Sequence, residues 1–180
     1  RVGGVAHGTA QCGYKPRAHL DGRVGAALSL VRGESDRLAG RSRVPLILCA
    51  DDYGLAPGVS EAIRELLALG RLSATSCMSV TPHWATEGPR LLPFRARADL
   101  GLHLTLTDHA PLGRMQHLAP AGRLPTLARL MVRAFSGTLG RDEVAAEIDR
   151  QIDRFETVIG SAPAFLDGHQ HVHLLPVIRD

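Results

Sequence analysis

The sequence lacks several features that mark nucleic-acid-binding and membrane proteins. Aromatic residues make up only 4% of the 180 residues, and Lys15 is the single lysine, so the net charge of +3 comes from arginine. No basic stripe is interleaved with aromatic residues, which argues against nucleic-acid binding. No apolar run approaches the ~18 residues of a membrane-spanning helix, and residues 26–31 are too short for the core of a signal peptide. We therefore expect a cytoplasmic protein without a membrane span.

Cysteine is also scarce. Cys12, Cys49 and Cys77 are widely spaced and form no CxxC or other thiolate metal motif. Cys49 and Cys77 lie within apolar runs, so we interpret them as small buried side chains in a reducing compartment.

The length suits one domain with a real hydrophobic core. Residues 1–43 are rich in Gly, Arg and Ala and show little periodicity. We expect a poorly specified, disordered extension there, with a short helix at residues 25–30 as the alternative. Residues 44–180 are expected to form the folded domain.

From residue 44 onward, strand-like and helix-like segments alternate. The hydrophobic pattern predicts strands at 45–50, 74–80, 99–106 and 163–166, a long loop at 108–125, and the beginning of a helix at residue 176. It predicts helices at 57–69, 85–92, 126–135 and 141–159. This alternation is typical of a parallel α/β fold. A closed (β/α)-barrel needs about 200 to 250 residues, so we expect a TIM-like, (β/α)-barrel-like sheet that is incomplete in this chain.

Polar side chains cluster where three of these strands end. Asp51 and Asp52 follow the first strand, and His103 lies in the third. A run of acidic and imidazole groups follows the fourth: Asp167, His169, His171 and His173. The carboxyl ends of parallel strands meet at one rim. Two histidines and one carboxylate from separate strands would form a metal site with open positions, and a second carboxylate could act as a general base.

Each group also has a simpler explanation. The two aspartates could cap a helix or lie in a solvated turn, and His103 could be a satisfied core histidine. The His-x-His-x-His run is harder to explain in this way, since a period of two predicts all three imidazoles on one face of an extended segment. Taken together, the three clusters favour a metal site.

Three blocks of sequence carry a family resemblance: residues 50–55, 101–107 and 166–173. They resemble, in order, the signature blocks of the YdjC/ChbG-like carbohydrate deacetylases, which include the hopanoid-associated HpnK deacetylases. The resemblance covers residues 44–180, and the segment 72–76 also agrees with it. Tyr53 stands where the family usually has Phe.

The resemblance implies a divalent-metal hydrolase that removes N-acetyl groups from an amino sugar, in an oligosaccharide or a glycolipid head group. Asp51 matches the family's proposed catalytic base, and Asp52, His103 and His169 match its metal ligands. The other members of the last block would contact substrate or support the ligands: Asp167, His171 and His173. Mg²⁺ is the expected ion, with Zn²⁺ or another divalent ion compatible with these ligands.

Other readings remain open at this stage. The family's barrel continues past residue 180, so this chain would hold the N-terminal part of the domain, and as a fragment we would expect it to have little activity. Another metal-dependent hydrolase, such as a phosphoesterase, and an inactive metal-binding fragment are the alternatives. A homodimer is compatible with the sequence.

Overall fold

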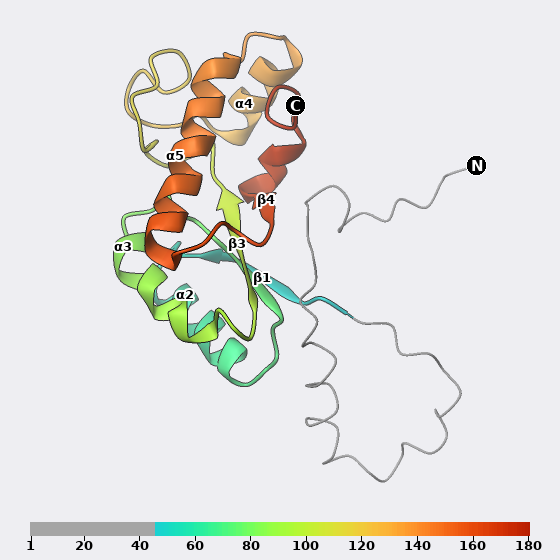
Figure 1. The fold of residues 1–180 in the computed structure, drawn as a ribbon. Coiled ribbons are helices and arrows are strands. Elements are labelled where there is room, and N and C mark those ends of the chain that lie inside the picture. Colours follow the sequence, from blue (N-terminus) through green and yellow to red (C-terminus); the bar gives the residue numbers. More distant parts are fainter. Residues whose placement is uncertain (1–45) are drawn as a thin grey trace, which may run out of the picture.

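A computed structural model describes residues 46–180, which fold around a four-stranded parallel sheet (Figure 1). The strands are β1 (Cys49–Tyr53), β2 (Ala74–Cys77), β3 (Asp99–Leu104) and β4 (Leu166–Gly168), and they lie side by side in chain order. The expected parallel α/β fold is confirmed. The sheet is open, with β1 and β4 at its two edges, and so corresponds to an incomplete barrel. The extension expected at 1–43 lies outside the described residues.

Helices connect these strands, and one 3-10 segment follows the last strand. They are α2 (Pro57–Ala68), α3 (Trp84–Glu87), the 3-10 helix η4 (Gly88–Phe94), α4 (Leu127–Phe135), α5 (Arg141–Ile159) and the 3-10 segment η5 (His169–Leu174). Helix α2 begins with Pro57, whose missing N–H costs nothing in a first turn. Helix α5 is followed by Gly160, whose φ of 79° is the left-handed conformation that glycine adopts easily. The predicted bounds of α5 agree with the structure.

All six residues of β3 are buried, as expected for an inner strand of a parallel sheet. One core cluster lies around β1, β2 and β3, where the rings of Trp84 and Phe155 stack 5.7 Å apart. A second cluster joins the end of β3, the loop between β3 and α4, and α4 itself. Gly101 in β3 allows the Phe165 ring to approach the strand closely, because a Cβ there would lie 2.4 Å from that ring. Helix α5 runs along β3 (Figure 1) and covers it from one side.

The structure corrects several predicted boundaries. The strand predicted at 45–50 begins at Cys49 and continues to Tyr53, so Asp51 and Asp52 lie within β1. A register shift between Ala50 and Tyr53 lets the strand continue past the two carboxylates, while Leu46 before it is 83% exposed. The strand predicted at 163–166 is found at 166–168, and the one predicted at 74–80 ends at 77. No helix begins at residue 176, where the described backbone forms a turn.

None of the helices of residues 46–180 is both long and apolar enough to cross a membrane.

Candidate metal centre

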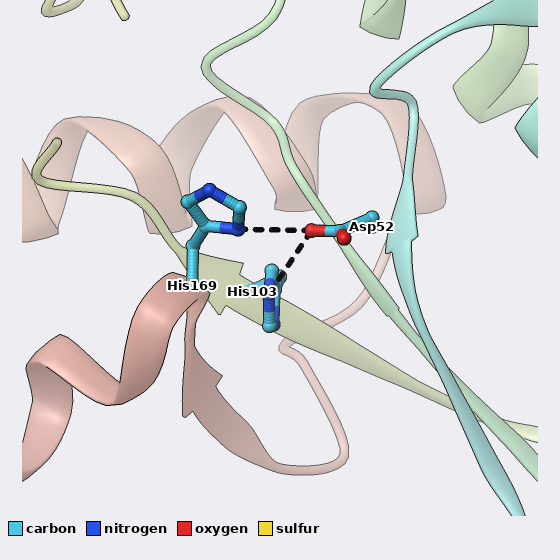
Figure 2. A group of neighbouring side chains, drawn as sticks. All are labelled: Asp52, His103 and His169. Atoms are coloured by element: carbon cyan, nitrogen blue, oxygen red, sulfur yellow. Dashed lines mark hydrogen bonds and ion pairs between the residues drawn. The ribbon is translucent and has the colours of Figure 1, made fainter. Parts of the chain in front are cut away.

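The register shift in β1 gives Asp52 an unusual backbone conformation. Its φ of 64° is uncommon for a residue other than glycine, although Asp tolerates it better than most. In this position the Asp52 Oδ1 atom lies 3.0 Å from Nδ1 of His169 and 3.3 Å from Nε2 of His103 (Figure 2). One carboxylate oxygen therefore faces two imidazoles that come from distant parts of the chain.

His103 projects from β3, and its side chain is almost completely buried. Its register partner on β4 is Asp167, and the Asp167 Oδ1 atom lies 2.7 Å from Nδ1 of His103. The hydroxyl of Ser76 on β2 lies 3.1 Å from the same nitrogen and 3.2 Å from Oδ1 of Asp51. The imidazole of His103 is thus held between two carboxylates, one at each ring nitrogen.

The charges around His103 shift its titration. Burial by itself lowers the pKa of His103, because it disfavours the charged imidazolium. The hydrogen bond to Asp167 and the negative charge of that residue act in the opposite direction, as do the charges of Asp51 and Asp52. The result is a pKa of His103 above its ordinary value, because the surrounding carboxylates favour the protonated ring.

Asp52, His103 and His169 fit a divalent cation. They offer one oxygen and two nitrogens that all lie within 4.8 Å of one another. The Asp52 carboxylate lies between the two imidazoles, close enough to each for a proton or a metal ion to bridge them. The other nitrogen of His103 is bound by a carboxylate, an arrangement that orients metal-binding histidines in many proteins.

A second group of candidate ligands is Cys49, Asp51 and Asp167, whose ligand atoms also lie within 4.8 Å of one another. Burial, then the charges of Asp167 and Asp51, raises the pKa of the Cys49 thiol to about 12. The Cys49 side chain is therefore a neutral thiol at neutral pH, and it donates a long hydrogen bond of 3.9 Å to Oδ1 of Asp51. Because metals bind the thiolate, a metal ion at this second group would have to displace the thiol proton.

The expectation for the His-x-His-x-His run is wrong. Residues 169–174 do not form an extended strand but the 3-10 segment η5, and Gln170 and His171 have φ values of 54° and 59°. The three imidazoles therefore do not share one face. His169 joins Asp52 and His103, while His171 is exposed and lies 6.3 Å from the ring of His173.

His173 packs against the backbone of β4. A Cβ at Gly168 would lie 2.7 Å from its Nδ1 atom, which is buried and has no hydrogen-bond partner among the described residues. Burial is the largest cause that lowers the pKa of His173, followed among the lowering causes by the charges of His171 and His103.

The structure also places near the site two residues that the motifs did not single out. Ser76 links Asp51 to His103, as described above. His109, on the loop after β3, lies edge-on to His169 with 6.2 Å between ring centroids. Burial lowers the pKa of His109, as do the charges of His169 and Arg123. His109 lies two residues beyond the block 101–107, but its sequence neighbours do not show that the loop turns back to the site.

Comparisons with known proteins point to one family. Residues 45–180 match the family model of the YdjC-like proteins. A chitooligosaccharide deacetylase of Yersinia pestis bv. Antiqua (strain Angola) is 39% identical over 136 residues, which are 74% of this chain and 52% of that protein. A chitooligosaccharide deacetylase of Yersinia pseudotuberculosis serotype O:3 is 38% identical over the same shares. The chain thus spans about half the length of the curated relatives that it matches.

A solved structure shows the same fold. The crystal structure of a protein from Enterococcus faecalis, named for cellobiose-phosphate cleavage, aligns with a TM-score of 0.60 and 26% sequence identity. The alignment covers 73% of this chain and 51% of that one. Since the family model matches well over half of the sequence, this chain belongs to the YdjC-like protein family.

Proposed function

We propose that this chain is part of a metal-dependent carbohydrate N-deacetylase that acts on an acetylated amino sugar. The observation that carries the proposal is the convergence of Asp52, His103 and His169 at one rim of the sheet. The chitooligosaccharide deacetylases among its relatives support an acetylated sugar as the substrate class.

In this proposal Asp52, His103 and His169 hold one divalent cation, with Mg²⁺ as the first candidate. Bound there, the cation would polarise the acetyl carbonyl and lower the pKa of water. Asp167 holds the His103 ring by its Nδ1 atom, so that Nε2 faces the site. His171 and His173, further along η5, are proposed as substrate contacts on the strength of the family resemblance.

Asp51 is the proposed general base. Its side chain is exposed, and it is not part of the Asp52 group, so its carboxylate is available to water. In the reaction, the water oxygen bonds to the acetyl carbon while the water proton passes to Asp51. The carbon–nitrogen bond then breaks, and the amine nitrogen takes up that proton. The products are acetate and the free amino sugar.

The test is a comparison of Asp51→Asn with the parent chain. We expect acetate release from a chitooligosaccharide to fall by about 10² to 10⁴-fold, while the affinity for Mg²⁺ changes less than threefold. Acetate is measured by a coupled assay and metal binding by calorimetry. Acetate release by Asp51→Asn at the parent rate would show that Asp51 is not the base.

A phosphoesterase is the second candidate, because the Enterococcus faecalis relative is named for cleavage of a phosphorylated disaccharide. The same preparations should be tested for phosphate release from a sugar phosphate. Phosphate release without acetate release would favour this second reaction over the first.

A further inference from the structure

Helix α5 carries two polar side chains that are completely buried and have no part in the proposed chemistry. Glu147 and Gln151 are each 0% exposed, and their spacing of four residues places them on the same face of the helix. Burying a carboxylate costs free energy unless it is fully hydrogen-bonded. The hydrogen-bond partners of these two side chains therefore indicate their role.

Gln151 binds the backbone directly after β3. Its Nε2 atom donates to the carbonyl of Thr105 at 2.8 Å, and its Oε1 atom accepts from the N–H of Thr105 at 3.0 Å. Both backbone groups of one residue are therefore satisfied by one side chain. Thr105 is only two residues after His103, so this contact fixes the chain where it leaves the metal centre.

Glu147 binds the same loop further along. Its two carboxylate oxygens accept hydrogen bonds from the N–H groups of Leu112 and Gly113, at 2.8 and 3.1 Å. Arg150 balances the charge, with its Nε atom 3.0 Å from Oε2 of Glu147. A Cβ at residue 113 would lie 2.2 Å from the Arg150 guanidinium, so glycine allows the close approach.

The segment between these two contact points contains His109. The backbone carbonyl of His109 accepts from the N–H of Leu124 at 2.8 Å, which closes the loop. The loop is thus bound by α5 at Thr105 and at residues 112–113, and the His109 ring between them lies 6.2 Å from the ring of His169. His109 is half-buried, so part of the residue remains accessible.

We propose that Glu147 and Gln151 are positioning residues that hold His109 at the rim of the metal centre, where its imidazole contacts the bound sugar. The inference rests on the proposed function for the nature of the ligand, an N-acetylated saccharide. The positioning itself depends only on the contacts of α5 with the loop.

The positioning is tested first without ligand, by NMR on the 180-residue chain. In Glu147→Gln, an NH₂ group replaces one carboxylate oxygen and cannot accept a hydrogen bond. The side chain can then no longer use one oxygen for the N–H of Leu112 and the other for the N–H of Gly113. We expect hydrogen exchange at these two amides to accelerate at least tenfold, and the nuclear Overhauser contact between the His109 and His169 rings to disappear. Asp149→Asn, an exposed substitution on the same helix, should change neither. Persistence of the ring contact in Glu147→Gln overturns the proposal.

Gln151→Glu gives an independent variant at the other contact point. It keeps the acceptor for the N–H of Thr105 but loses the donor to its carbonyl, and it should also remove the contact between the two rings. An unchanged ring contact in a folded Gln151→Glu chain likewise overturns the proposal.

The role of His109 is tested by the binding of tri-N-acetylchitotriose in the presence of Mg²⁺, in the Asp51→Asn background to prevent turnover. We expect His109→Ala and Glu147→Gln each to weaken binding about tenfold, the effect of one lost hydrogen bond. The double variant should be no weaker than either single one, because both act through the same ring. Mg²⁺ affinity should stay within threefold throughout.

If the losses of trisaccharide affinity add up in the double variant, Glu147 does not act through His109, and the proposal is overturned. Failure of the trisaccharide to bind the parent would overturn the substrate role of His109. Coupled binding losses in a chain whose wild type releases no acetate would instead support the inference while rejecting the proposed deacetylation.

Discussion

The metal centre and the polar face of α5 are both partly or fully buried, but their hydrogen bonds are balanced differently. On α5, each carboxylate oxygen of Glu147 and both amide atoms of Gln151 have partners of the matching kind. At the metal centre, one oxygen of Asp52 faces two imidazoles, and His103 has a carboxylate at each ring nitrogen. A neutral imidazole has only one N–H, so both contacts of His103 can be made only if a proton or a cation is added.

This difference distinguishes a structural polar cluster from the proposed metal site. The α5 cluster is complete within the chain, so it gains nothing from a ligand and serves to fix the loop. The metal centre is complete only with an added positive charge. Substitutions in the two regions should therefore affect different measurements.

The largest effect is expected for Asp52→Asn. The substitution removes the only carboxylate of the Asp52, His103 and His169 group and leaves a weaker amide oxygen. Since loss of a group that merely supports a ligand costs about 10- to 100-fold in metal affinity, loss of this ligand should cost at least about 100-fold. Calorimetric titration with Mg²⁺ and Mn²⁺ measures the change, and Asp153→Asn, an exposed substitution on α5, is the control. An affinity within tenfold of the parent would contradict the assignment of Asp52.

The opposite pattern is expected for Glu147→Ala. The substitution leaves the N–H groups of Leu112 and Gly113 without their acceptor and Arg150 without its partner. We expect the free energy of unfolding to fall by about 2 to 3 kcal/mol, as measured by urea denaturation, with metal affinity within threefold of the parent. A Glu147→Ala chain as stable as the parent would show that the α5 cluster is not structural.

A smaller effect on the metal centre is expected for Asp167→Asn. The amide oxygen can still accept from Nδ1 of His103, but the negative charge is gone, so we expect a loss of about tenfold in metal affinity. Because the hydrogen bond and charge of Asp167 are the main causes that raise the pKa of His103, that pKa should fall in the variant. An NMR titration of His103 without metal measures the shift.

The sign of the pH dependence follows from the raised pKa. In the metal-free parent, the proton on His103 stabilises the fold below the unfolded pKa of about 6.5, and this stabilisation is lost as the pH rises through the higher folded pKa. A metal must displace the same proton, so the parent's metal affinity should rise with pH up to that folded pKa. In Asp167→Asn the rise should end at lower pH. An identical pH profile in both chains would exclude Asp167 as the cause.

Much of the site could be predicted because its residues lie at the ends of strands. The hydrophobic pattern located β1, β3 and the approach to β4, and the convergence of parallel strand ends then brought Asp52, His103 and His169 together. The same reasoning failed for His171 and His173, because it assumed an extended backbone. The left-handed conformations of Gln170 and His171 depend on how η5 packs against β4, which a period-two pattern does not reveal.

The sequence by itself determined the parallel α/β fold, the helix at 141–159 and the family, because periodicity and short motifs are local properties of the chain. Only the tertiary structure decided that Asp167 binds His103, that Ser76 links His103 to Asp51, and that His109 returns to the rim of the site. These contacts join residues from different strands and loops, and their geometry depends on the register of β3 against β4 and on the anchoring of a loop by α5. Neither is encoded in the spacing of any one motif, since both arise from packing between elements that are distant in sequence.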